Sequence, residues 1–200
     1  MKKAIALLMA ALMTLGLCGC SLKDFTKTLT LTEPEEVTEA FFNGLKTKNE
    51  DALILYTANE DINMLLHSSG DKEDLNLIYD SLFKNFTYKI GAVKKNKDET
   101  AATVEVEVAN SDFSKVLKKY QEKAYSYMEE NLYSGKVNKK NLNAKCLSIF
   151  AEQVEKASKS EPGQAQKLTV KLTKNDNYSW DMELTEEMMK TIMGGLIIPL

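Results

Sequence analysis

Hydrophobic side chains recur along this 200-residue chain at two different periods. A spacing of three to four residues, which places side chains on one face of a helix, is found over residues 33–48, 49–56, 71–84, 113–132, 142–157 and 185–193. Thr32 is a suitable cap for the first helix, and Pro34 suits its first turn. Gly194 and Gly195 are a typical stop signal for the last helix.

Two parts of the chain alternate apolar and polar residues instead. Residues 86–92 and 102–108 flank the turn sequence KKNKDE, and residues 168–173 and 178–184 flank Asn175-Asp176-Asn177. A period of two predicts β-strands with one buried face, and the short polar connections predict two hairpins.

The order of these segments predicts the fold class. We expect an α+β domain over residues 33–200, in which an antiparallel sheet of two hairpins, about four strands, packs against helices. Residues 113–132 and 142–157 form a long helical pair inserted between the hairpins. A chain of this length can bury enough surface for one domain without disulfides.

The first nineteen residues have the composition of a secretory signal. Lys2 and Lys3 precede an apolar run from Ala4 to Leu17, and small residues follow it. The run holds fourteen residues, whereas a membrane-spanning helix needs about 20. A cleaved signal peptide over residues 1–19 is therefore favoured over a retained anchor helix.

The sequence Leu17-Cys18-Gly19-Cys20 resembles the lipobox of bacterial lipoproteins. Small Gly19 at the cut allows the peptidase to reach the peptide bond, and the Cys20 thiol is where the lipid attaches. Cys18 follows bulky Leu17 and does not fit. This resemblance implies cleavage between Gly19 and Cys20, lipidation of Cys20, and a tether over residues 20–32. It places the domain at the extracytoplasmic face of the cell membrane.

The helices followed by twisted hairpins resemble the nuclear-transport-factor-2-like fold, also called SnoaL-like or cystatin-like. The residues that carry this resemblance are EPEEVTEAFFNGLKTKNEDALILY at 33–56 and LTVKLTKNDNYSWDMEL at 168–184. It implies a cone-like space between sheet and helices that serves as a binding pocket or an active site. The long helical pair departs from the minimal fold and leaves the strand order open.

Strand parity indicates which side chains face that space. The inward positions of both hairpins carry no carboxylate or imidazole, because Glu105, Glu107, Asp181 and Glu183 fall on the opposite face. Candidate pocket-lining residues are Tyr88, Tyr178, Trp180 and Met182, although residues of this kind are more often plain core.

Catalytic, metal and cofactor sites have little support in the sequence. His67 is the single histidine, and its neighbours Ser68 and Ser69 offer no useful geometry for a nucleophile and base. Once Cys20 is lipidated, Cys146 is the free thiol, so neither a disulfide nor a common zinc site can form. We expect no catalytic residues, no metal and no cofactor.

Charge argues against nucleic acid as a partner. Every basic side chain is lysine, and the formal net charge is −3. Arginine, the usual reader of phosphates and bases, is absent.

Three functions stay open from the sequence. The first is a lipid-anchored, non-catalytic binding module for a small apolar ligand or an envelope protein. The second is a SnoaL-like hydrolase or isomerase, which would need a polar pair in the cone. The third is a structural or assembly role in the cell envelope.

Overall fold

A computed structural model of the chain describes residues 33–49, 51–53, 72–131, 139–176 and 179–196. All of them fall within one compact unit, Thr32–Leu200. The predicted cleavage site with Cys20, the predicted lipidation site, lies outside the described residues, as do His67 and Tyr178.

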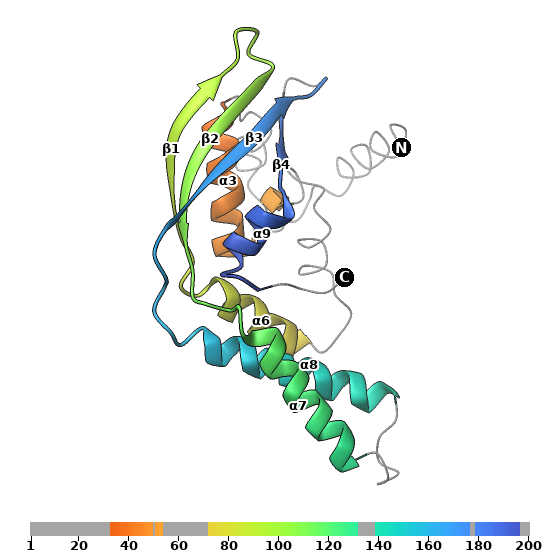
Figure 1. Ribbon diagram of the computed structural model, residues 1–200. Helices are drawn as coiled ribbons and strands as arrows, with labels where there is room; N and C mark the ends of the chain where they lie inside the picture. Colours follow the sequence, from red (N-terminus) through yellow and green to blue (C-terminus); the bar gives the residue numbers. More distant parts are fainter. Residues whose placement is uncertain (1–32, 50, 54–71, 132–138, 177–178, 197–200) are drawn as a thin grey trace. The chain divides into compact units, whose positions relative to one another are not determined.

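The described elements confirm an α+β fold with an antiparallel four-stranded sheet (Figure 1). In chain order they are α3 (Pro34–Thr47), α6 (Lys72–Phe83), β1 (Thr87–Lys95), β2 (Ala101–Ala109), α7 (Val116–Asn131), α8 (Lys139–Ala157), β3 (Gln166–Lys174), β4 (Trp180–Glu183) and α9 (Glu186–Ile192). The strand order is β1-β2-β3-β4, so both predicted hairpins form and then pair with each other. The pair α7 and α8 lies between the hairpins in sequence, as predicted.

Helix ends follow local chemistry. Pro34 stands in the first turn of α3, while Glu33 rather than the predicted Thr32 holds the cap position. The Thr185 side chain accepts a hydrogen bond from the Met188 backbone N–H at 3.2 Å and caps α9. A helix start leaves backbone N–H groups unpaired. Pro34 has no such group, and Thr185 accepts a hydrogen bond from one of them.

The sheet buries one face under α3. Helix α3 contacts β1, β2 and β4, and its Phe41 and Phe42 are fully buried. From the sheet, Val104, Val106 and Val170 are fully buried as well. The opposite face carries threonine, lysine and acidic residues. Among the acidic residues, Glu105, Asp181 and Glu183 are exposed. The predicted division into an inner and an outer face is therefore confirmed for β2, β3 and β4.

Strand β1 contains an irregularity that the alternation did not predict. Ile90 pairs with Val106, but the next paired residue, Val93, lies opposite Val104. Gly91 and Ala92 thus oppose a single residue of β2, which is a β-bulge. The bulge reverses the parity, so Ala92, expected on the inner face, is exposed and Val93 takes its place.

Candidate ligand-binding cleft

Strand β4 is much shorter than its neighbour, and this difference creates a gap in the fold. The four residues of β4 pair with Lys171–Lys174, so the first half of the nine-residue β3 has no fourth strand beside it. After Glu183 the chain turns into α9, whose residues Met188, Met189 and Ile192 are buried. The space between the sheet and α9 is therefore open to solvent where β2 ends and β3 begins.

A cleft of about 410 Å³ lies at this opening. Its twelve lining residues come from the end of β2, the segment leading into β3, and the end of α9, and they are Val108, Ala109, Asn110, Ser111, Asp112, Gly163, Gln164, Ala165, Gln166, Thr191, Gly194 and Gly195. The volume is within the range of small-molecule sites.

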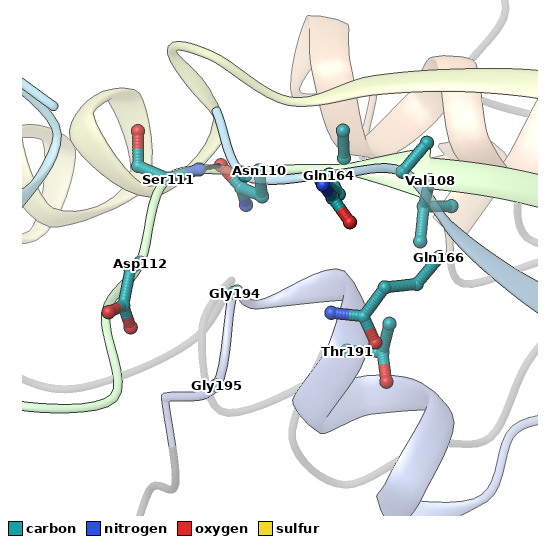
Figure 2. Close-up of a pocket in the computed structure, with 12 residues that line it drawn as sticks. Val108, Asn110, Ser111, Asp112, Gln164, Gln166, Thr191, Gly194 and Gly195 are labelled. Atoms are coloured by element: carbon teal, nitrogen blue, oxygen red, sulfur yellow. Dashed lines mark hydrogen bonds between the residues drawn. The ribbon is translucent and has the colours of Figure 1, made fainter. Parts of the chain in front are cut away.

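The polar character of the lining comes mainly from two glutamines. Figure 2 shows the amides of Gln164 and Gln166 directed into the space that α9 borders, whereas the Ser111 side chain points away from it. Both glutamines are exposed, and neither amide has a hydrogen-bond partner among the described residues. Each amide offers donors and an acceptor to a ligand.

The floor of the cleft is rigid because Asn110 binds three elements together. Its Nδ2 donates to the carbonyl oxygens of Leu82, at 3.0 Å, and Ile192, at 2.9 Å. Its Oδ1 accepts from the Ser111 backbone N–H at 2.8 Å. The two carbonyls belong to the last turns of α6 and α9, where helices leave acceptors unpaired. Asn110 thus fixes both helix ends against the end of β2.

Ser111 extends this network to the segment before β3. Its hydroxyl donates to the Ser160 carbonyl at 2.8 Å and accepts from Asn85 Nδ2 at 3.0 Å. The same Asn85 nitrogen donates to the Ser158 carbonyl at 2.8 Å. The backbone of Gly163 donates to the Asn110 carbonyl at 3.0 Å. These bonds position the loop that carries Gln164 and leads into β3 at Gln166.

The wall opposite the glutamines includes two glycines after α9. The backbone N–H groups of Gly194 and Gly195 donate to the carbonyls of Thr191 and Lys190, at 3.0 and 2.8 Å. This is the Schellman arrangement, and it requires the positive φ of +59° at Gly194. A Cβ atom at Gly194 would lie 2.0 Å from the Ser111 carbonyl oxygen. The predicted stop signal is therefore confirmed, and it also allows α9 to approach β2 closely.

Asp112 is the single titratable side chain in the lining. Hydrogen bonds from the Ser114 hydroxyl and from the Ser114 backbone N–H, with Lys115 nearby, hold the pKa of Asp112 below its usual value. The backbone bond measures 2.9 Å. The cleft therefore presents one ionised carboxylate at its edge and no lysine.

The predicted pocket residues that the structure describes, Tyr88, Trp180 and Met182, do not line this cleft. Trp180 and Met182 are buried core side chains, and neither lines the cleft. Tyr88 shares its row of the sheet with Val108 and Gln166, but its hydroxyl donates to Glu39 Oε1 of α3 at 2.7 Å. Burial and Glu39 raise the pKa of Tyr88. This tyrosine fastens α3 to β1.

Parity could have identified one of the cleft residues. Counting back in twos from Leu168 places Gln166 on the inner face, opposite Val108. A glutamine at an inward position signals that the core has ended there. Nothing in the local sequence could have identified Gln164, Asp112 or Thr191, because these residues come together only when β2, the loop before β3 and α9 meet.

Cys146 is a partly buried free thiol in α8. The pKa of Tyr120 is raised by burial and by its contact with Cys146. Among the described residues, no three histidine, cysteine, aspartate or glutamate side chains gather to hold a metal ion. No helix in the described part of the chain has the length and apolarity to cross a membrane.

Comparison with known proteins identifies the family of this chain. The family described as a domain of unknown function, DUF5105, matches residues 23–197. The chain belongs to DUF5105. The match includes every residue of the cleft, so the cleft is part of the DUF5105 domain. The resemblance to nuclear-transport-factor-2-like domains stays a prediction.

One solved structure is similar to this DUF5105 chain. It is the crystal structure of a putative lipoprotein (ycdA) from Bacillus subtilis subsp. subtilis str. 168, with 20% sequence identity and a TM-score of 0.41. The similar region covers 64% of this chain and 39% of the other. The chain thus spans well under half the length of that protein. No curated protein matches the chain.

Proposed function

We propose that this DUF5105 protein is a lipid-anchored, extracytoplasmic binding protein whose ligand occupies the cleft between β2, β3 and α9. The observation that carries the proposal is the pair of unpaired amides on Gln164 and Gln166, which project into a space of about 410 Å³ over a rigid floor. A site that is formed before the ligand arrives loses less free energy on binding.

The lining favours a polar ligand. The sequence left open a small apolar ligand within the cone or an envelope protein as the partner, but the inner face under α3 is filled by side chains such as Phe42, Val104 and Trp180. The two glutamine amides supply donors and acceptors, and Asp112 supplies the one charge. A ligand that is neutral or positively charged, and that carries several hydroxyl, amide or amine groups, complements this set.

Binding accounts for the cleft better than catalysis does. A hydrolase or isomerase needs a base together with an acid or a nucleophile within hydrogen-bond reach. Asp112 is alone among the lining residues in being titratable, and its lowered pKa makes it a weak base.

The anchor is supported by the signal-like residues 1–17 and by the lipobox that ends at Cys20. Two or more acyl chains hold a protein stably on a membrane, whereas one does not. Cell fractionation tests this part. Cys20→Ala should move the protein out of the membrane fraction, and Cys18→Ala, the matched control, should leave it there. Retention of the Cys20→Ala protein would contradict lipidation at this residue.

The cleft is tested by what the native protein carries. The chain is purified from its own membrane without unfolding and then denatured, and the small molecules released are measured by mass spectrometry. Wild type should release a polar compound that Ala165→Trp, which places a bulky ring in the cleft lining between Gln164 and Gln166, does not. Ala144→Trp, at an exposed position of α8, is the control and should behave as wild type. Equal release from wild type and Ala165→Trp would exclude the cleft as the binding site.

A further inference from the structure

Helix α7 is unusually exposed for an element of its length. Of its sixteen residues, only Val116 and Ala124 are buried. Tyr125 is 64% exposed and is the single large hydrophobic side chain that is strongly exposed in the described part of the chain. The half-buried side of α7 contacts α8, so the side that carries Tyr125 has no covering element among the described residues.

The charges of α7 are arranged against the helix dipole. Lys118 and Lys119 lie in the first turn, Glu129 and Glu130 lie in the last, and neither turn holds a charge of the favourable sign. A helix is stabilised by acids at its start and bases at its end. Helices α3 and α9 both follow that rule, with acidic first turns and a lysine in the last turn.

The described fold offers little compensation for this reversed arrangement. Lys118 pairs with Glu122 within the helix at 4.0 Å, and both side chains are largely exposed. Such pairs contribute little. Glu129 and Glu130 form no ion pair with any described side chain. A sequence that departs from a local rule without an internal gain often does so for a partner.

An exposed stripe of α7 has the symmetry that a second copy needs. Lys118, Glu122, Tyr125 and Glu129 recur at spacings of four, three and four, so they lie along one side, here named the outer stripe. The centre of α7 falls between Lys123 and Ala124. Lys118 lies five residues before this central pair and Glu129 five residues after it. An antiparallel copy of the helix would place each Lys118 opposite the other chain's Glu129.

We propose that the outer stripe of α7 pairs antiparallel with the same stripe of a second copy of this chain. The contact is isologous, with a two-fold axis near the middle of α7 and the two Tyr125 rings close to it. The lysine-rich start of each helix meets the glutamate-rich end of the other. The two helix dipoles are then antiparallel. Each unfavourable group of charges at a helix end lies beside charges of the opposite sign on the other chain.

Cysteine crosslinking in intact cells tests the contact with the full chain. Tyr125→Cys, in a chain that also carries Cys146→Ser, should give a covalent dimer on mild oxidation. Thr169→Cys, at an exposed site on the outer face of the sheet, is the matched control. Cys146→Ser alone measures any crosslinking through the two N-terminal cysteines. Dimer from Tyr125→Cys no greater than from Thr169→Cys would overturn the proposal.

Charge reversal then tests the antiparallel direction. In the Tyr125→Cys chain, Lys118→Glu with Lys119→Glu should lower the dimer yield roughly fivefold, because acidic ends then face each other. Glu129→Lys with Glu130→Lys should do the same with basic ends. All four substitutions together should restore the yield, as should co-expression of the two half-reversed chains as a mixed dimer.

The same variants separate self-association from a role within the α7–α8 pair. If the reversed charges serve packing on α8 instead, the half-reversed chains lose thermal stability and the crosslink yield does not change. That outcome refutes the proposal. Under the proposal the four-fold variant melts no lower than wild type, because its α7 charges now agree with the helix dipole.

Discussion

Gly194→Ala tests the way in which the cleft is built. The φ of +59° at residue 194 costs a residue with a side chain about 1–2 kcal/mol. The new Cβ atom would lie 2.0 Å from the Ser111 carbonyl oxygen, so the end of α9 has to move by about 1 Å to reach an acceptable contact. A shift of that size breaks the bond between the Phe113 N–H and the Gly194 carbonyl, now 2.8 Å long.

These costs add to a measurable loss of stability. With about 1 kcal/mol for the lost hydrogen bond, we expect Gly194→Ala to lower the free energy of unfolding by about 2–4 kcal/mol. For a domain of this size that corresponds to a Tm lower by about 5–15 °C. Urea and thermal unfolding followed by circular dichroism measure both quantities.

A second glycine of the cleft provides the control. A Cβ atom at Gly163 would lie 3.8 Å from the Asn110 carbonyl oxygen, which is ordinary contact. Gly163→Ala should therefore stay within about 0.5 kcal/mol of wild type. A Gly194→Ala protein as stable as Gly163→Ala would refute the close approach of α9 to β2, and with it the wall of the cleft.

Three further substitutions test the polar contacts. Asn110→Ala should cost about 3 kcal/mol in urea unfolding, because the carbonyls of Leu82 and Ile192 lose their buried donor; a loss under 1 kcal/mol would contradict this role. Tyr88→Phe should cost at most about 1 kcal/mol at pH 8. Because the pKa of Tyr88 is raised in the folded state, this difference should be complete below pH 10.0 and shrink above it; a difference that grows with pH would be inconsistent with the bond to Glu39. Asp112→Ala should be slightly less stable than wild type at pH 7. Since the pKa of Asp112 is lowered, that difference should fade as the pH falls below 3.8, and its persistence at pH 2.5 would contradict the cause assigned.

The fold could be predicted from the sequence because its elements keep a strict period. The alternation in Ala102–Val108 and Leu168–Leu172 defined two strands and their buried face, and both faces are confirmed. The bulge in β1 could not be predicted, since Gly91 and Ala92 are both small and fit either face. A bulge depends on how β1 pairs with β2, which the sequence of one strand does not determine.

The candidate site was much less predictable. Aromatic residues on the strands suggested a pocket in the cone, but the Trp180 side chain is buried in the core. The cleft depends on the early end of β4 and on the turn into α9. Thr185, which caps α9, and Gly194, which ends it, determine both features. The sequence shows where the helix begins and ends, but it does not show that a cleft forms beside it.

Native mass spectrometry of protein extracted from its own membrane tests the lipid anchor and the ligand in the cleft in one measurement. We expect a chain that begins at an acylated Cys20 and carries an additional small polar molecule, which is lost when Gln164 and Gln166 are both replaced by alanine. An unmodified chain beginning at Met1, or an identical bound mass on the double variant, would contradict this expectation.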